Sequence, residues 1–198
     1  TANPLERLAI DLSAVIGADA AEAIGLIESM RHNENTLHVA AGLALHAAPP
    51  ARRLIVLEDQ FEETFTLCRD DALRQAFVDN LLYAANAAQG RAIVLLTLRA
   101  DFYGKCAEYP RLADALSDRS ELVGPMTEEE LRLAIQQPAQ LVGAELEPGL
   151  VEVLLRDVRG EPGNLPLLQH ALLELWERRA GRKLTRAAYE EIGGGEGA

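Results

Sequence analysis

The sequence has few of the residues on which several classes of protein depend. Its 198 residues include only two cysteines, Cys68 and Cys106, which excludes a disulfide framework and indicates reduced thiols in a cytoplasm. Aromatic residues make up 5% of the chain, too few for the aromatic-rich cleft of a carboxylate-dependent glycosidase. No apolar run approaches the roughly 18 residues of a membrane-spanning helix, and no signal peptide is visible. The sequence therefore predicts a cytoplasmic protein with no membrane partner.

Positive charge is scarce as well. The formal net charge is −12, and only two residues, Lys105 and Lys183, are lysines. This balance argues against a general electrostatic grip on nucleic acid, although it leaves room for a local basic pocket. The four histidines, at positions 32, 38, 46 and 170, lack the spacing of a zinc site.

The first half of the chain combines helical and strand patterns. Helical spacing in the Ala-rich start is carried by Leu5, Leu8, Ala9 and Leu12, and Pro49-Pro50 ends this region. "RLIVLE" and "AIVLLTL" (92–98) lack alternation, which is typical of strands buried on both faces. Between them, "DDALRQAFVDNLLYAANAAQG" predicts a helix capped by Gly90, with an apolar stripe of Leu73, Phe77, Leu81 and Leu82.

The second half is expected to be helical. "ELVGPM" (121–126) predicts a third, short strand, so that strands and helices alternate as in a parallel α/β sheet. Thr127 and Glu130 then form a capping box, and Pro148 fits the first turn of a later helix. "GNLPLLQHALLELWERRAG" predicts one more helix, with one side formed by Leu168, Leu172, Leu175 and Trp176. We therefore expect an α/β part over 1–125, an all-helical part over 126–198, and a frayed or linking tail.

Acidic residues cluster directly after the first predicted strand. Asp59 follows "LIVLE" and Arg99 follows "IVLLTL", so both stand at the carboxyl ends of strands, where parallel sheets bind ligands. An aspartate there can hold magnesium, Glu62 or Glu63 can position an attacking water, and an arginine can bind a phosphate. Two plainer interpretations remain open. The acids can form a solvated loop or helix start, and Arg99 can pair with Asp101 or Asp59.

Four long segments carry a family resemblance. "LIVLEDQFEETFTLC" resembles the Walker B segment of the novel STAND NTPases, which are P-loop ATPases of the signalling type. "LLTLRADFYGKCAEYPRLADAL" is similar to their sensor-arginine segment. "ELVGPMTEEELRLAIQQPAQLVG" and "GNLPLLQHALLELWERRAGRKLTRAAYEEIGG" are similar to their helical lid. The resemblance implies a partial P-loop-type parallel sheet followed by a helical lid subdomain.

The resemblance also implies roles for individual residues. Asp59 would be the magnesium-side Walker B acid, and Glu62 and Glu63 the candidates for positioning water. Arg99 would be the sensor, and Pro166 would lie near the adenine, although a proline in a first helical turn needs no ligand. One departure is Glu58, which stands where the family has an apolar strand residue. It indicates a wetter strand end or a shifted register.

The phosphate-binding loop of this class is missing from the sequence. A G-x-x-x-x-G-K-[ST] loop wraps the phosphates in backbone N–H groups, and no such motif occurs here. "GKC" at 104–106 lacks it, because Arg99 replaces the first glycine and Cys106 the Ser or Thr. The chain starts with Thr1, so we expect a piece of a longer protein whose loop lies upstream, or a degenerate family member. ATP and magnesium are expected only in the intact parent, and this chain alone is expected to be inactive.

Two functions follow from these patterns. In the first, the chain is part of an ATP-dependent signalling switch whose nucleotide governs assembly, with other domains attached elsewhere. In the second, it is a non-catalytic interaction or assembly module that keeps the fold. In the P-loop class that the chain resembles, the strand before the phosphate-binding loop lies between the sensor strand and the next strand. Its absence here would leave two strand edges unpaired, which predicts self-association, or direct pairing of "AIVLLTL" with "ELVGPM".

Overall fold

The first helices begin and end at the residues best suited to cap them. The computed structural model describes residues 3–158 and 165–193, in two units, Thr1–Glu121 and Leu122–Ala198. In the first unit, Asn3 caps α1 (Pro4–Ile16), and Gly17, at a φ of 74°, ends it. Asp19 begins α2 (Ala20–His32) with a capping box, and α3 (Thr36–Ala44) follows.

Two parallel strands form the sheet of the first unit. β1 (Leu54–Glu58) pairs with β2 (Ala92–Leu96) in a register that sets Leu54 opposite Ala92 and Glu58 opposite Leu96. The crossover between them contains the short α4 (Glu63–Thr66) and the long α5 (Asp71–Asn86). Because the strands are parallel and in register, their carboxyl ends lie side by side.

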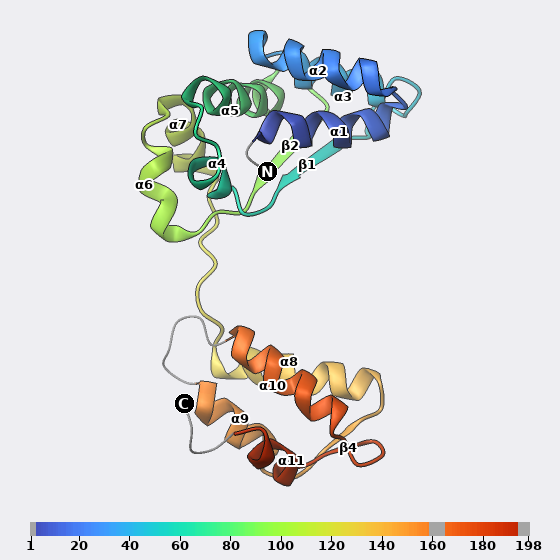
Figure 1. Ribbon diagram of the computed structural model, residues 1–198, viewed down its shortest axis with the longest axis vertical. Helices are drawn as coiled ribbons and strands as arrows, with labels where there is room; N and C mark the ends of the chain where they lie inside the picture. Colours follow the sequence, from blue (N-terminus) through green and yellow to red (C-terminus); the bar gives the residue numbers. More distant parts are fainter. Residues whose placement is uncertain (1–2, 159–164, 194–198) are drawn as a thin grey trace. The chain divides into compact units, whose positions relative to one another are not determined.

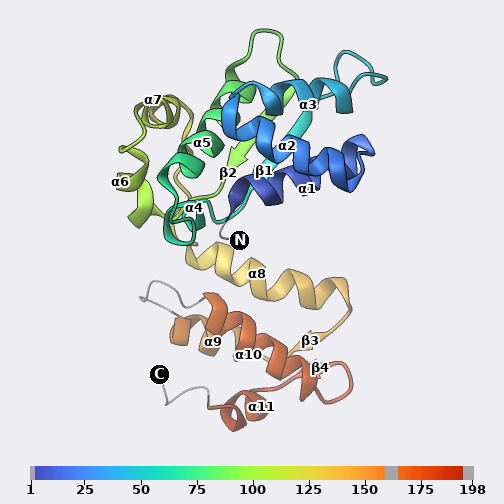
Figure 2. The same ribbon diagram turned by 45° about the horizontal axis from the view of Figure 1, so that its top comes forward.

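Helices cover one face of this sheet. Figures 1 and 2 show α1, α2, α3 and α5 gathered on the same side of β1 and β2. The core there includes the apolar stripes expected for α1 and α5, packed with Val56 and Ala92 of the strands. Asn80, fully buried in α5, joins three helices: its side chain accepts from Leu37 N–H and donates to the Met30 carbonyl.

The other face of the sheet is open, which corrects the expectation of strands buried on both faces. Four apolar side chains on it stay exposed: Ile55 (60%), Leu57 (61%), Ile93 (43%) and Leu95 (50%). Parallel sheets are ordinarily covered on both faces. The lack of alternation in both strands therefore predicts that this face is buried, but no described residue of the first unit covers it.

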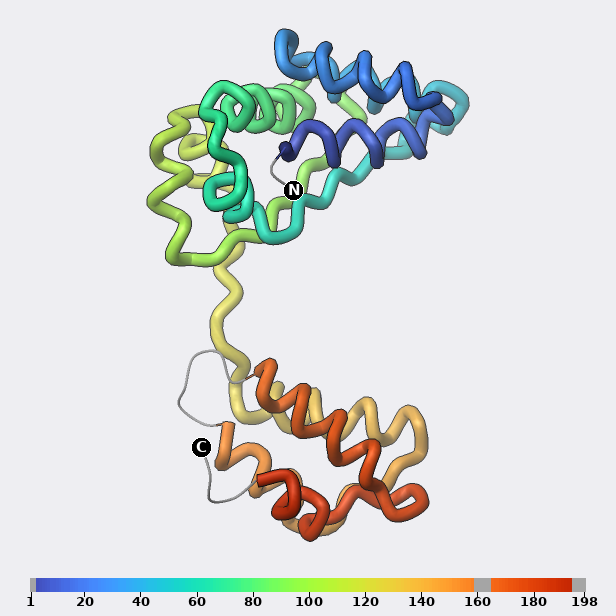
Figure 3. Tube along the Cα trace, in the orientation of Figure 1, coloured from blue at the N-terminus to red at the C-terminus, as the bar shows by residue number. Residues whose placement is uncertain are grey.

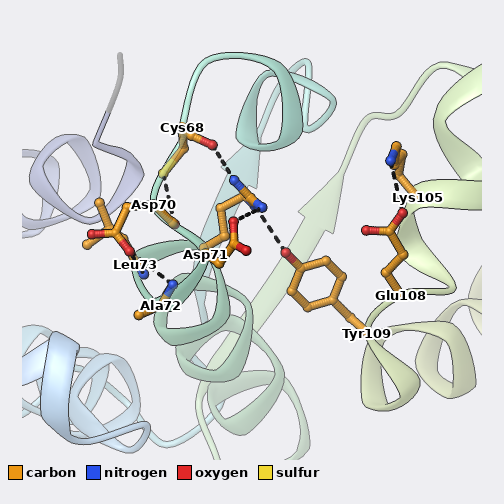
Figure 4. Close-up of polar contacts among 9 residues, drawn as sticks. Cys68, Asp70, Asp71, Ala72, Leu73, Lys105, Glu108 and Tyr109 are labelled. Atoms are coloured by element: carbon orange, nitrogen blue, oxygen red, sulfur yellow. Dashed lines mark hydrogen bonds and ion pairs between the residues drawn. The ribbon is translucent and has the colours of Figure 1, made fainter.

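Polar contacts join the segment around α5 to the helices that follow β2. The helices after β2 are η1 (Ala100–Phe102), α6 (Tyr103–Cys106) and α7 (Pro110–Arg119). Arg74 pairs with Asp71, donates to the Cys68 carbonyl, and donates through Nε to the Tyr109 hydroxyl at 3.1 Å. Figure 4 shows the Tyr109 hydroxyl directed at this guanidinium, and Asp70 capping the start of α5. The turn that follows the acidic segment is thus tied to α7.

Two sequence predictions in this region are wrong. The segment 121–126, "ELVGPM", forms no strand and all six residues are exposed. It therefore does not pair with β2, and Gly124 and Pro125 disfavour strand structure. Gly90 does not cap α5, which ends at Asn86 with Ala87 as its cap, because the chain turns there before a short loop.

The second unit is mainly helical but not entirely so. The predicted capping box starts α8 (Glu128–Leu141), and α9 (Leu150–Val158), α10 (Leu165–Glu177) and α11 (Arg186–Glu191) follow. A parallel pair of two-residue strands, β3 (Glu145–Leu146) and β4 (Lys183–Leu184), corrects the all-helical expectation. Pro148 lies in the turn before α9 rather than in its first turn. Residues 163–164 of the predicted last helix, and the tail 194–198, fall outside the described residues.

The core of the second unit follows the predicted stripe except at one residue. Leu168 and Leu175 are buried against Ile135, Leu150 and Leu154. Trp176, expected to point inward, is 37% exposed, and the Arg179 guanidinium lies 4.1 Å from its ring centroid. A cation over a tryptophan face keeps one side of the ring at the surface.

Tyr189 makes the stability of the second unit sensitive to alkaline pH. Burial and a hydrogen bond to Asp157 raise its pKa from 10.0 to about 12. Between those values an unfolded tyrosine loses its proton while Tyr189 keeps it, so the folded state binds more protons and stability falls as the pH rises. We expect Tyr189→Phe to reduce the loss of unfolding free energy between pH 10 and 12. Tyr103→Phe, at an exposed site in the other unit, should leave that loss unchanged. Urea unfolding followed by the fluorescence of Trp176, the single tryptophan, measures both.

Candidate functional site

The carboxyl ends of β1 and β2 bring the predicted acids next to the segment that carries Arg99. β1 ends at Glu58, and the chain turns through Gln60, whose φ of 56° is unusual for a residue with a side chain. α4 then begins at Glu63. Figure 3 shows this turn beside the start of α1. The predicted site residues from Asp59 to Arg99 thus share one edge of the sheet.

Thr97, which no sequence pattern marked as a site residue, holds this turn in place. Its hydroxyl donates to Asp59 Oδ1 at 2.5 Å and accepts from Gln60 N–H at 2.8 Å. Its backbone N–H donates to the Glu58 carbonyl, and its carbonyl accepts from Phe61 N–H. Thr97 thus makes four hydrogen bonds to this turn, and the one from its hydroxyl orients the Asp59 carboxylate. The signal was available, because Thr97 is the polar residue at the end of an otherwise apolar run.

Asp59 faces a hollow of about 250 Å³ that also involves α1. Its lining comprises Pro4, Arg7, Glu58, Asp59, Glu63 and Thr64. Arg7 pairs with Asp11 at 3.0 Å and places a cation beside the acids. No sequence pattern marked Arg7 or Pro4 for this site, because only the folded chain brings α1 to the tip of β1.

The two candidate glutamates occupy different surroundings. Glu62 is partly buried, and its Oε2 accepts the backbone N–H of Arg99 at 3.3 Å, so it links the two strand ends. Glu63 is exposed and lines the hollow with Asp59, and its carboxylate makes no hydrogen bond to the described part of the chain. Glu63 is therefore the glutamate whose carboxylate is available to a water in the hollow.

Glu58 is a carboxyl group in an unfavourable position. Its partial burial at the end of β1, together with the negative charges of Asp11 and Glu63, raises its pKa, while the Arg7 charge opposes the rise. The pairing of Glu58 with Leu96 is in register, so the departure noted at this position causes no slip of the strand.

Arg99 is engaged with a neighbour rather than with the acids of β1. Its guanidinium makes a bidentate pair with Asp101, at 3.0 and 2.9 Å, and this pairing lowers the pKa of the Asp101 carboxyl. Of the two salt bridges considered from sequence, the one to Asp101 is present. Both side chains are more than half exposed, and such a pair contributes little to stability. Arg99 can therefore exchange this partner for an incoming anion at small cost.

A comparison with protein families decides the relationship of the chain. The model of the family described as Novel STAND NTPase 1 matches residues 1–198, the whole sequence. The chain belongs to this family. Curated proteins and solved structures give no match.

An NTPase family implies a nucleotide and a magnesium ion, and the acidic edge fits the metal side of such a site. Thr97 binds one oxygen of the exposed Asp59, and the other has no hydrogen bond in the described residues. Magnesium typically takes one or two carboxylates and completes its shell with water and phosphate. Among the described residues no three His, Cys, Asp or Glu side chains converge on one point, so these residues build no all-protein cage.

Two further sequence predictions concern Pro166 and membrane-spanning helices. Pro166 lies exposed in the first turn of α10, in the second unit, where a proline is favoured with or without a ligand. No helix of residues 3–158 and 165–193 has the length and apolar content needed to cross a bilayer.

Proposed function

We propose that this novel STAND NTPase chain contributes the metal- and water-binding side of an ATP site in a signalling switch. Asp59 would hold magnesium, directly or through water. Glu63, and otherwise Glu62, would orient the attacking water, and Arg99 would bind the phosphate that carries the developing charge. Pro166 would pack near the adenine. The observation that carries the proposal is the oriented Asp59 carboxylate beside the unpaired Glu63 in one hollow.

The contributions of these residues follow from their surroundings. ATP with its magnesium ion would supply the phosphoryl group that is transferred to water. Thr97 fixes the direction of the Asp59 carboxylate, which lowers the cost of ordering it around a cation. The Arg7 charge in the hollow offsets part of the repulsion among the acids. The weak Arg99–Asp101 pair leaves the guanidinium able to turn toward a phosphate.

The open face of the sheet supports a second candidate function, assembly without nucleotide chemistry. Ile55, Leu57, Ile93 and Leu95 form an apolar surface that monomeric proteins usually cover. Self-association, or contact with other domains of a longer parent protein, would cover it. The two functions are compatible, because a nucleotide-governed switch also needs a surface on which it assembles.

We expect the chain as printed to bind magnesium-ATP weakly or not at all. The missing loop supplies backbone N–H groups, a lysine and a magnesium-binding hydroxyl in this class. If each lost charged hydrogen bond is worth about 1.5–3 kcal/mol, a few losses move the affinity from micromolar to millimolar or weaker. Titration calorimetry measures this, with magnesium alone as the control. Micromolar affinity would mean that other residues bind the phosphates, and the role of Asp59 would have to be reassigned.

A further inference from the structure

An apolar groove in the second unit is lined by none of the residues assigned to the nucleotide site. It has a volume of about 300 Å³ and is lined by Ala134, Ile135, Pro138, Ala139, Val142, Leu146, Leu172, Leu173, Trp176 and Leu184. Its walls are the C-terminal halves of α8 and α10, which run side by side in Figures 2 and 3. The volume is near the lower end of the range of ligand pockets, and every lining side chain is apolar.

The shape of the groove follows from its residues. On α8 the lining residues recur with helical spacing, and Ala134, Pro138 and Ala139 are small, so this wall is low. Leu173 and Trp176 of α10 form a higher wall. Ile135 and Leu184 are buried and form the floor. Val142, Leu173 and Trp176 remain 58%, 54% and 37% exposed, so the groove is open along its length.

Positive charge stands at one end of this groove, although the chain as a whole is strongly negative. The Arg179 guanidinium lies over the Trp176 ring and donates to the Trp176 carbonyl. Arg182 donates to the carbonyls of Gly143 and Val142, which places it beside the same end. Neither arginine pairs with a carboxylate anywhere in the described residues.

The two arginines keep hydrogen-bonding capacity that the fold does not use. A guanidinium has five N–H donors, and the bonds to carbonyls occupy one on Arg179 and two on Arg182. Both side chains are exposed and anchored by those bonds, so a carboxylate can approach them without reordering either one. A guanidinium binds a carboxylate through two parallel N–H donors, a geometry that a carboxylate of a protein partner matches.

We propose that this groove binds an amphipathic helix whose apolar stripe fills it and whose carboxylates, at one end of the stripe, pair with Arg179 and Arg182. An open groove between two helices suits a helix with apolar residues at positions i, i+3, i+4 and i+7. The charge at the end of the groove specifies an acidic partner and fixes its direction. A basic helix with the same stripe would meet the arginines with like charge.

Trp176 makes the proposal directly testable, because it is the single tryptophan and it lines the groove. The probes are two synthetic helical peptides with the same leucine stripe, one with glutamates in its end turn and the other with lysines there. We expect the glutamate peptide to shift the Trp176 emission to the blue saturably and to bind at least ~10-fold more tightly at low salt. Added salt should narrow the difference.

Matched variants separate the groove from the rest of the surface. Leu173→Asp should abolish binding, and Leu167→Asp, on the same helix but outside the groove and 63% exposed, should not. Arg179→Glu combined with Arg182→Glu should reverse the preference between the peptides. Arg179→Gln, which leaves the bonds from Arg182 to the Gly143 and Val142 carbonyls in place, should reduce the preference without reversing it. Circular dichroism confirms that each variant is folded.

Three results would overturn the proposal. The first is equal affinity for both peptides, and the second is binding that Leu173→Asp leaves unchanged. The third is a blue shift of Trp176 that depends on protein concentration alone and accompanies dimerisation in sedimentation, which would assign the groove to a second copy of the chain.

Discussion

Phe61→Ala should lower the free energy of unfolding of the first unit by about 3–5 kcal/mol. Phe61 is 1% exposed although it stands in the middle of the acidic segment. Its ring meets Phe65 edge-on at 5.4 Å between centroids and stacks with Phe77 at 6.3 Å. Its backbone N–H also donates to the Thr97 carbonyl. Phe61 thus anchors to the core the turn that carries Asp59. The mutation should therefore loosen both the turn and the core packing around Phe77.

Leu67→Ala is the matched control, because Leu67 follows α4 in the same segment but is 45% exposed. Urea unfolding should show a change below about 1 kcal/mol for this variant. Hydrogen exchange at Gln60 and Phe61 would report whether the turn itself has loosened. Similar urea midpoints for both variants would mean that Phe61 does not anchor the turn and that its stacking with Phe77 does not stabilise the fold.

Glu63→Gln should slow ATP hydrolysis about 100-fold in a parent protein that carries the phosphate-binding loop, with nucleotide binding retained. The carboxylate of Glu63 is exposed in the hollow and has no hydrogen-bond partner within the described residues, so it is free to orient or activate a water. Its amide counterpart keeps the shape and loses the basicity. Single-turnover hydrolysis and equilibrium binding of ATP separate the two effects.

Glu62→Gln is the comparison variant for that experiment. Glu62 accepts the N–H of Arg99, and a neutral amide oxygen can still accept this bond, so the loss of hydrolysis should be smaller. If Glu62→Gln slows hydrolysis more than Glu63→Gln, then Glu62, and not Glu63, is the residue that orients the attacking water. If neither variant slows it, the acidic segment does not act on water.

The elements with strong local signals could be predicted from the sequence. The stripe of Leu5, Leu8 and Leu12 and the capping box of Thr127 and Glu130 produced helices where expected. Such features depend on contacts within a few residues, so their sequence pattern is sufficient. Both apolar runs also formed strands, β1 and β2, since a run of branched apolar residues favours an extended chain that pairs.

Features that depend on distant partners could not be predicted. "ELVGPM" has apolar residues but no strand beside it among the described residues, and a strand without a neighbour leaves its backbone groups to water. The pairing of β3 with β4 joins two-residue segments about forty positions apart, too short for any periodicity. Trp176 has an apolar ring at a helical core spacing, yet Arg179 competes for that ring and keeps it at the surface.

The candidate site divides in the same way. That Asp59 and Arg99 stand at neighbouring strand ends followed from the order of strand and helix alone. The hydrogen bonds of Thr97 and the presence of Arg7 in the hollow required the folded chain, because side chains more than thirty residues apart meet there.

The most direct test of the account is magnesium-dependent ATP binding by a longer chain that carries this sequence together with a phosphate-binding loop, with and without Asp59→Asn. Asparagine keeps the size of the side chain and an acceptor for the Thr97 hydroxyl, but it loses the charge that attracts the cation. Titration calorimetry should show affinity about tenfold weaker or more in magnesium, equal to ~1.4 kcal/mol. In EDTA the two proteins should differ little, and Asp118→Asn, at an exposed position on α7, should behave as the wild type. Equal magnesium-dependent affinities for Asp59→Asn and the wild type would contradict the assignment of Asp59 to the metal side of the site.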